Sequence, residues 1–260
     1  MKAMILAAGR GERMRPLTDT VPKPLLRVGD RPLIVHLIDQ LVREGYTDLT
    51  INHAYLGARI EKALGDGQKF GARIRYSREQ PGAFDTGGGI RNALPLLGND
   101  PFLVVNGDIR MDYPFSRLAD KPRRGLAHLV LVANPSHNTK GDFGLILPDH
   151  RGEARDTPAP PDKPRDGIVS NHGGERLTFS GLGVYRPELF LDWKPGNFPL
   201  GQVLRRAAEK GQVTGERYAG EWQDIGTPER LRKLADQLQE SSVMRRDGGD
   251  VEENQDHTYP

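Results

Sequence analysis

The sequence predicts an α/β fold in which a mostly parallel central sheet lies between layers of helices. Two observations carry this prediction. Short apolar runs alternate with amphipathic stretches along the first half of the chain, and glycine or polar residues end each apolar run. Of the 260 residues, 36% are hydrophobic and 28% are charged, which is enough apolar material for one sizeable core. We therefore expect one α/β domain over residues 1–240.

The expected elements of the first half follow one another as this fold requires. Strands are expected at residues 1–7, 48–52, 72–77, 101–105 and 128–133. Helices are expected at residues 32–44, 56–64 and 89–97. Leu33, Leu37 and Leu41 mark the apolar stripe of the first helix, and Gly45 can end it. Strands that alternate with helices favour a parallel sheet.

A polar stretch separates this half from the last elements. Residues 148–175 are rich in Pro, Asp, Arg and Gly and have few large apolar side chains, which predicts a flexible insertion. Order is expected again at residues 177–185, 200–207 and 222–225. Thr227 and Pro228 are typical of the N-cap and first residue of a last helix. The polar residues 241–260 lack periodicity and are expected to form a disordered tail.

The composition excludes several classes of function. A net charge of +2 leaves no broad basic face for nucleic acid. Cysteine is missing, which excludes disulfides, thiolate metal sites and a cysteine nucleophile, and which fits a reducing cytosol. No apolar run approaches the ~20 residues of a membrane helix, and no signal-peptide pattern opens the chain. We therefore expect a cytoplasmic protein with no nucleic-acid or membrane partner.

The loop after the first strand is the most informative part of the sequence. In LAAGRGERM, Gly9 and Gly11 let the backbone approach a ligand without a Cβ in the way. Arg13 offers a planar guanidinium suited to phosphate oxygens, and Lys23 stands between two prolines that restrict its backbone. The pattern favours a site that binds a nucleoside triphosphate through backbone N–H groups and fixed cations. An ordinary turn with solvated charges is the alternative.

Two other nucleotide-binding loops fit less well. A dinucleotide-binding loop needs a third glycine, where this chain has Met14, and an acidic residue after the second strand, where Asn52 and His53 stand. A Walker loop needs G-K-[ST], which does not follow here. An NAD-dependent oxidoreductase is therefore disfavoured.

Two aspartates follow later strands. Asp108 comes after Asn106 and Gly107 at the end of the fourth strand, and Asp224 stands in WQDIGT. Each aspartate alone is more often a turn or cap residue than a metal ligand. Beside a triphosphate site they are candidates for Mg²⁺, which takes one or two carboxylates besides phosphate oxygens and waters.

Three consecutive glycines, residues 87–89, open the helix expected at 89–97. They are costly in chain entropy, so we expect that a ligand approaches the backbone there. A flexible turn before the helix is the alternative.

The stretch from Leu6 to Thr18, followed by PKP at residues 22–24, closely resembles the signature of the sugar-1-phosphate nucleotidyltransferases. The resemblance implies a Rossmann-like three-layer nucleotidyltransferase fold. It implies that Arg13 stabilises the pyrophosphate leaving group and that Lys23 holds phosphate oxygens at the reacting centre. The nucleotide-binding residues that it implies are Ala7, Ala8, Gly9, Gly11, Glu12, Arg13, Lys23, Thr86, Gly87 and Gly88.

The same resemblance assigns the metal and sugar sides of the site. Asp108 and Asp224 match the family's G-D and D-x-G-T-P positions and would hold the metal. The residues that would face the sugar are Asn106, Asp142, Gly144, Ser180 and Gly181. An ordinary loop role for Asp142 and a strand role for Ser180 are the alternatives. Lys163 is the only counterpart of a sugar-binding lysine that many relatives carry.

The run DTGGGI resembles the N-acetylmuramate-1-phosphate uridylyltransferases, which typically have glutamate where this chain has Asp85. The resemblance implies a Mg²⁺-dependent reaction of UTP with N-acetylmuramic acid 1-phosphate. The products would be UDP-N-acetylmuramic acid and pyrophosphate, in peptidoglycan recycling. The alternatives are a mannose-1-phosphate guanylyltransferase, a glucose-1-phosphate thymidylyl- or uridylyltransferase, and a nucleotide-sugar sensor without turnover. A monomer or small homo-oligomer is expected.

Overall fold

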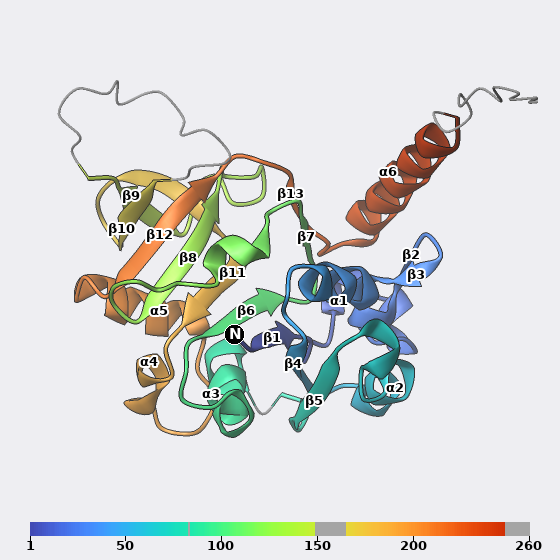
Figure 1. Ribbon diagram of the computed structural model, residues 1–260, viewed down its shortest axis with the longest axis horizontal. Coiled ribbons are helices and arrows are strands. Elements are labelled where there is room, and N and C mark those ends of the chain that lie inside the picture. Colours follow the sequence, from blue (N-terminus) through green and yellow to red (C-terminus); the bar gives the residue numbers. More distant parts are fainter. Residues whose placement is uncertain (83, 149–164, 248–260) are drawn as a thin grey trace, which may run out of the picture.

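A mixed sheet of nine strands is the centre of the computed structural model, which describes residues 1–82, 84–148 and 165–247 (Figure 1). For residues 239–247 it describes the backbone only. The strand order is β5-β4-β1-β6-β11-β8-β12-β10-β9. The strands are β1 Ala3–Leu6, β4 Asp48–His53, β5 Arg73–Arg78, β6 Phe102–Asn106, β8 Ala127–Val132, β9 Phe143–Ile146, β10 Asp166–Ser170, β11 Glu175–Tyr185 and β12 Val213–Tyr218. Two short ribbons pair β2 Arg27–Val28 with β3 Arg31–Pro32, and β7 Ile109–Met111 with β13 Trp222–Asp224.

Helices cover both faces of the sheet and complete three layers (Figure 1). They are α1 Leu33–Arg43, α2 Gly57–Leu64, α3 Thr86–Leu97, α4 Glu188–Leu191, α5 Leu200–Glu209 and α6 Pro228–Asp247. The helices α1 and α2 pack on one face, and α3, α4 and α5 pack on the other. Since successive side chains of a strand face opposite sides, Ile5 joins the first core and Met4 the second. The predicted three-layer α/β fold is confirmed.

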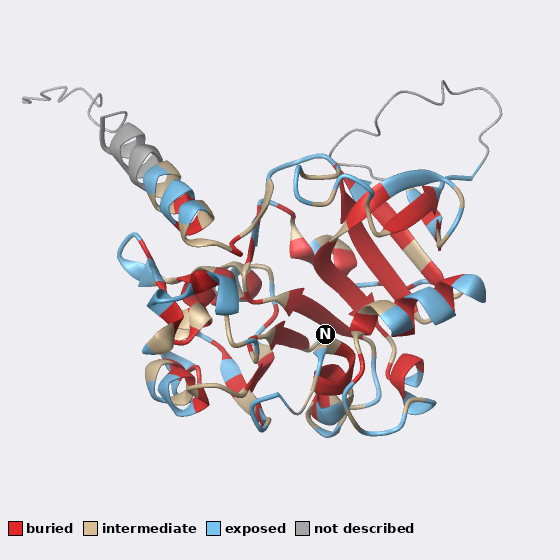
Figure 2. Ribbon diagram, turned by 180° about the vertical axis from the view of Figure 1, so that it is seen from behind, coloured by how far each residue is buried: buried red, intermediate tan, exposed pale blue. Residues whose placement is uncertain are grey.

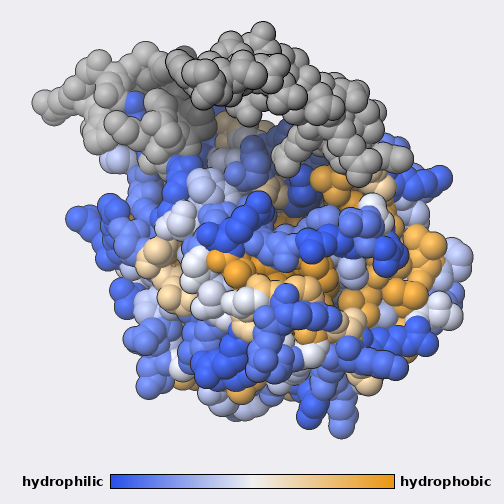
Figure 3. All heavy atoms as spheres, turned by 45° about the vertical axis from the view of Figure 1, so that its right-hand side comes forward, coloured by the Kyte–Doolittle hydropathy of each residue, from blue (hydrophilic) through white to orange (hydrophobic). Residues whose placement is uncertain are grey.

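Most of the large apolar side chains are buried, although some remain exposed. Figure 2 shows buried strands between helices whose outer sides are exposed. Figure 3 shows a face on which hydrophilic side chains make most of the surface, with apolar ones visible between them. None of the helices in the described part of the chain is both long and apolar enough to cross a membrane.

The two halves of the sheet differ in strand direction. The strands β5, β4, β1 and β6 are parallel, as predicted. The strand β11 then runs antiparallel to both β6 and β8, and β10 runs antiparallel to both β9 and β12. The sheet as a whole is therefore mixed, and its parallel character belongs mainly to the first half.

The predicted flexible insertion, residues 148–175, was wrong for residues 166–170. These residues form β10, in which Gly167 and Val169 are buried while Ile168 is exposed. Only one large apolar side chain enters the core, so the polar composition concealed the strand. Backbone hydrogen bonds to β9 and β12 hold it instead. Residues 149–164 of the predicted insertion lie outside the described residues.

Two predicted helix boundaries also need correction. The helix expected at residues 89–97 begins at Thr86, so the three glycines form its first turn, and Asp85 is its N-cap. The last helix continues to Asp247, so the predicted tail was wrong for residues 241–247. Strong helix formers such as Met and Arg continue a helix there without an apolar stripe. Residues 248–260 lie outside the described residues.

Candidate active site

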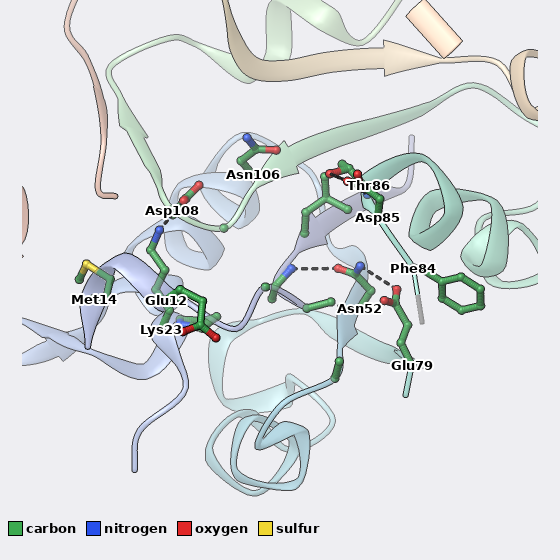
Figure 4. A pocket seen from close by; sticks show the side chains of 18 of the residues that line it. Glu12, Met14, Lys23, Asn52, Glu79, Phe84, Asp85, Thr86, Asn106 and Asp108 are labelled. Carbon is green, nitrogen blue, oxygen red and sulfur yellow. Dashed lines mark hydrogen bonds and ion pairs between the residues drawn. The ribbon is translucent and has the colours of Figure 1, made fainter. Parts of the chain in front are cut away.

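A cleft of about 400 Å³ lies at the carboxyl ends of β1, β4 and β6 (Figure 4). The chain proceeds from β1 to β4 on one side of the sheet and reaches β6 on the other, so this is a point where the strand order reverses. Open α/β sheets bind ligands at such points. The cleft is lined by the predicted residues Ala7, Ala8, Gly9, Gly11, Glu12, Arg13, Lys23, Thr86, Asn106 and Asp108.

The glycine loop is fixed by its own contacts. Gly11 has a left-handed backbone (φ 71°), and a Cβ there would lie 3.0 Å from Thr18 Cγ2. The fully buried Thr18 hydroxyl donates to the Gly11 carbonyl at 2.8 Å, and the Met14 N–H donates to the same oxygen at 2.9 Å. These contacts give the loop a defined shape, and glycine suits its bend at residue 11.

A second contact, which the sequence did not reveal, secures the far end of the loop. The Arg10 guanidinium lies 3.7 Å from the centroid of the Tyr55 ring and donates to the Thr18 carbonyl. The Tyr55 hydroxyl donates to the Asp19 carbonyl at 2.7 Å. Arg10 thus stabilises the loop, and the neighbouring Arg13 has no ion-pair partner within the described residues. The side chain of Arg13 is exposed at the edge of the cleft.

Lys23 and Asp108 meet across the cleft. Lys23 Nζ donates to Asp108 Oδ2 at 2.5 Å, and the lysine side chain is only 12% exposed (Figure 4). The Gly107 N–H donates to the Leu6 carbonyl at 2.9 Å, and a Cβ on Gly107 would lie 2.7 Å from that oxygen. The glycine therefore brings the end of β6 against the end of β1, which sets Asp108 opposite the glycine loop.

Asp224 does not line the cleft, but it lies next to residues that do. In the β7–β13 ribbon Asp224 is paired with Ile109, and the Ile225 N–H donates to the Asp108 carbonyl at 2.7 Å. A Cβ on Gly226 would lie 3.0 Å from Arg13 Nη2 and 3.2 Å from Asp224 Oδ2. The ribbon therefore joins the two predicted metal ligands at one edge of the cleft.

The two aspartates offer carboxylate oxygens, the donors that Mg²⁺ prefers. Each carboxylate now contacts a cation. Asp108 contacts Lys23, and Asp224 contacts Arg230 Nη1 at 2.5 Å and His137 Nε2 at 3.4 Å. Both positions therefore attract positive charge, and the donor set fits a Mg²⁺ ion held by Asp108 and Asp224.

The opposite wall of the cleft contains residues that sequence reasoning missed. Asn52 Oδ1 accepts from the Ala7 N–H at 2.9 Å, and Asn52 Nδ2 donates to Glu79 Oε1 at 2.9 Å (Figure 4). Burial raises the pKa of Glu79, and the hydrogen bond from Asn52 opposes that rise. Asn52 is the next-to-last residue of β4, at the edge of the sheet where Asp108 follows β6, and this position could have indicated it.

The predicted role of the three glycines receives a different explanation at two positions. A Cβ on Gly87 would lie 2.7 Å from the Phe198 ring, and a Cβ on Gly88 would lie 2.2 Å from the Gly196 carbonyl oxygen. Neither glycine lines the cleft, whereas Thr86 does. Close packing against residues 196–198 therefore requires glycine there. A Cβ on Gly89 would lie 2.7 Å from Glu79 Oε1 on the cleft wall.

The predicted sugar-facing residues fall into two groups. Asn106 lines the cleft. A Cβ on Gly181 would lie 2.5 Å from the side-chain nitrogen Nδ2 of Asn106. Gly181 has φ +85°, which suits glycine. The other three do not line the cleft and have partners within the sheet.

Asp142, Gly144 and Ser180 make contacts with neighbouring parts of the chain. Asp142 Oδ2 accepts from the Phe179 N–H at 2.9 Å. The Ser180 hydroxyl donates to the Val130 carbonyl at 2.7 Å, and Gly144 packs against the Gly173 carbonyl. Lys163 lies outside the described residues.

Comparison with known proteins agrees with this geometry. Residues 2–241 match the nucleotidyl transferase family. The chain belongs to this family. It is 49% identical over 240 residues to the N-acetylmuramate alpha-1-phosphate uridylyltransferase of Neisseria meningitidis serogroup B, which covers 90% of this chain and 96% of that enzyme. The predicted membership of the sugar-1-phosphate nucleotidyltransferases is confirmed.

Two further proteins are less similar to this chain. The mannose-1-phosphate guanyltransferase of Candida albicans is 32% identical over 234 residues, which cover 88% of this chain and 62% of that enzyme. The crystal structure of UDP-glucose pyrophosphorylase with UDP-glucose superimposes with a TM-score of 0.68 at 20% identity, over 92% of this chain and 98% of that one. The latter likeness supports the fold.

Proposed function

We propose that this protein transfers the uridylyl group of UTP to N-acetylmuramic acid α-1-phosphate, releasing pyrophosphate and forming UDP-N-acetylmuramic acid for peptidoglycan recycling. The observation that carries the reaction type is the meeting of the glycine loop with Lys23 and Asp108 in one cleft. The identity of the sugar and base rests on the 49% identical relative from Neisseria meningitidis.

In this reaction an oxygen of the sugar phosphate attacks the α-phosphorus of the triphosphate. One P–O bond forms on the side opposite the P–O bond that breaks, and the electron pair leaves with pyrophosphate. The attacking phosphate is already an anion near neutral pH, so no side chain has to act as a nucleophile or strong base. Positioning and charge neutralisation then account for catalysis.

The residues of the cleft divide these tasks. Backbone N–H groups of the glycine loop, which lines the cleft, would bind the triphosphate, and Arg13 at the exposed edge would stabilise the pyrophosphate charge. Lys23 supplies a compact positive charge at the reacting phosphorus when it leaves Asp108. A Mg²⁺ ion on Asp108 and Asp224 would supply further charge neutralisation at the phosphate oxygens.

The decisive test of substrate identity is a matrix of UTP, GTP, ATP and dTTP against the 1-phosphates of N-acetylmuramic acid, N-acetylglucosamine, glucose and mannose. Pyrophosphate release is measured with Mg²⁺ present. We expect kcat/KM for UTP with N-acetylmuramic acid 1-phosphate to exceed every other pair by at least about 10²-fold. A higher value for another pair would reassign the substrate, and tight binding with no release in any pair would indicate a sensor.

A further inference from the structure

Three polar side chains from β8, β12 and β10 meet in the second half of the sheet, two of them buried and one partly exposed. His128 on β8, Glu216 on β12 and Asp166 on β10 each offer one nitrogen or oxygen atom, and these atoms all lie within 4.8 Å of one another. The side chains of His128 and Glu216 are 0% and 2% exposed. A group of this kind inside a sheet needs compensation, because burying charged groups is costly unless they are paired.

The cluster is separate from the cleft. Val184 of β11 is paired with His128 on one side and with Leu103 of β6 on the other. Leu103 lies near the start of β6, whereas the cleft opens where β6 ends, at Asn106. None of the three residues of the cluster lines the cleft.

The hydrogen bonds of His128 direct a lone pair into the cluster. The Thr214 hydroxyl donates to the Ala127 carbonyl at 3.2 Å, so its oxygen accepts from His128 Nδ1 at 2.9 Å. A neutral imidazole with its proton on Nδ1 has a lone pair on Nε2. His128 Nε2 is buried and has no hydrogen-bond partner within the described residues.

The distance between His128 Nε2 and Glu216 Oε2 suits two ligands of one metal ion. His128 Nε2 and Glu216 Oε2 are 3.5 Å apart, which is longer than the 2.7–3.2 Å of a hydrogen bond. Two ligands bound at about 2.0–2.1 Å to one tetrahedral ion lie about 3.3–3.4 Å apart. The spacing therefore suits two ligands of a common metal ion better than a direct contact.

The carboxylates already have positively charged neighbours. Lys121 Nζ contacts Asp166 Oδ2, and Arg117 Nη2 lies 3.8 Å from Glu216 Oε1. The Tyr113 hydroxyl donates to that same Glu216 Oε1 at 2.8 Å, which leaves Oε2 turned to His128. Lys121 is only 7% exposed, so its ammonium already neutralises the carboxylate of Asp166 and would compete with a bound cation.

We propose that His128 Nε2, Glu216 and Asp166 form a structural binding site for a divalent transition-metal ion of the Zn²⁺ type, with water as the fourth ligand. An imidazole nitrogen with two carboxylates suits such ions, whereas Mg²⁺ and Ca²⁺ prefer oxygen ligands alone. Binding replaces the ammonium of Lys121 at Asp166. The ion would join β8, β12 and β10 and so stabilise the second half of the sheet.

The test uses the full-length protein without an affinity tag, stripped of metal by a chelator. Zn²⁺ bound per chain is measured after equilibrium dialysis, and Co²⁺ serves as a spectroscopic probe of a tetrahedral site. The background variant Asp108→Asn removes a ligand of the cleft, so that the remaining bound ion reports on the cluster. We expect one Zn²⁺ per chain, visible Co²⁺ bands, and a Tm raised by about 5–10 °C at a hundredfold excess over Kd.

Matched variants decide the assignment. His128→Gln and Asp166→Asn should each lose the bound ion and the rise in Tm, whereas His172→Gln, at an exposed histidine, should keep both. Should His128→Gln fail to fold, the partly exposed Asp166 still provides the test. Lys121→Met removes the competing ammonium and should tighten Zn²⁺ binding. Equal Zn²⁺ binding in Asp166→Asn and its parent, or no binding in the parent, would overturn the proposal.

Discussion

The two halves of the sheet use polar residues in opposite ways. In the parallel half, polar side chains stand at or just beyond strand ends, as Asn52, Asn106 and Asp108 do, and they face an open cleft. In the half from β8 to β9, His128 and Glu216 lie within strands and are closed off from solvent. The same sheet therefore has an open polar edge and an enclosed polar interior.

Strand direction accounts for this difference. Parallel strands end at one edge, where the loops that follow them converge and leave room for a ligand. The antiparallel strand β11 returns the chain to the other edge, so the loops of the second half are divided between two edges. His128 and Glu216 of that half are enclosed, so we expect changes to their contacts to affect stability more than turnover.

Replacing Asp108 by alanine should lower the rate of the reaction without lowering the stability of the fold. We expect kcat to fall by about 10³-fold at saturating Mg²⁺, or about 4 kcal/mol, because the carboxylate that we propose as a ligand of Mg²⁺ is lost. The midpoint of urea unfolding should stay near that of the wild type, since the backbone contact from Ile225 to the Asp108 carbonyl remains. Asp120→Ala, at an exposed aspartate, is the control. Near wild-type turnover in Asp108→Ala would rule out the metal assignment.

Gly88→Ala should show whether glycine is needed there for packing against residues 196–198 or for contact with the nucleotide. The added Cβ would lie 2.2 Å from the Gly196 carbonyl oxygen, so we expect a loss of about 2–3 kcal/mol in the free energy of unfolding. Gly9→Ala, in the cleft, meets nothing within 4 Å and should keep the stability of the wild type. Urea unfolding measures both. A stable Gly88→Ala protein with a raised KM for UTP would instead support contact with the nucleotide.

Tyr113→Phe should lower stability and leave turnover unchanged, whereas Asp108→Ala should lower turnover and leave stability unchanged. It removes the hydroxyl that donates to the buried Glu216, so we expect a loss of about 2 kcal/mol in stability and an unchanged kcat. Tyr185→Phe is the matched control, because the buried Tyr185 hydroxyl has no hydrogen-bond partner within the described residues. It should be neutral. A fall in kcat without a fall in stability for Tyr113→Phe would contradict the division between the halves.

Glu61→Gln should give the smallest effect, and the effect should depend on pH. The hydrogen bond from Arg78 lowers the pKa of Glu61 from its ordinary 4.5 to about 2, with His53 contributing and burial opposing. Because the pKa is lower in the folded state, the stabilisation is complete above about pH 5 and disappears as the pH falls towards 2. We expect a difference of about 0.5–1 kcal/mol from the wild type at pH 7. Urea unfolding at pH 7 and pH 3 checks this, and an equal difference at both would exclude the ion pair as its source.

The same division separates what the sequence could predict from what it could not. Gly9, Gly11, Arg13 and Lys23 form a local pattern, so their joint site could be predicted from their order. Asn52 was assessed only as a mismatch to a dinucleotide-binding motif, because its contact with Ala7 depends on how β4 pairs with β1. Local patterns do not contain the pairing of strands that lie far apart in the sequence.

Composition was an unsafe guide in the second half for a related reason. The strand β10 has only Val169 in the core, and its other contributions are backbone hydrogen bonds that any sequence can make. Gly88 was attributed to a ligand, whereas the Gly196 carbonyl occupies the space that a side chain would need. The three glycines thus marked a close approach correctly, but the approaching group comes from the protein itself.

The contact between Gly107 and Leu6 has a mechanical consequence. The N–H···O hydrogen bond of 2.9 Å continues the parallel pairing of β1 with β6, so it joins the strand that leads into the glycine loop to the strand that leads into Asp108. The glycine loop and the Asp108 carboxylate therefore both extend from the same pair of hydrogen-bonded strands. A substitution that separates the ends of β1 and β6 would keep the side chains of the cleft but change the position of the glycine loop relative to Asp108.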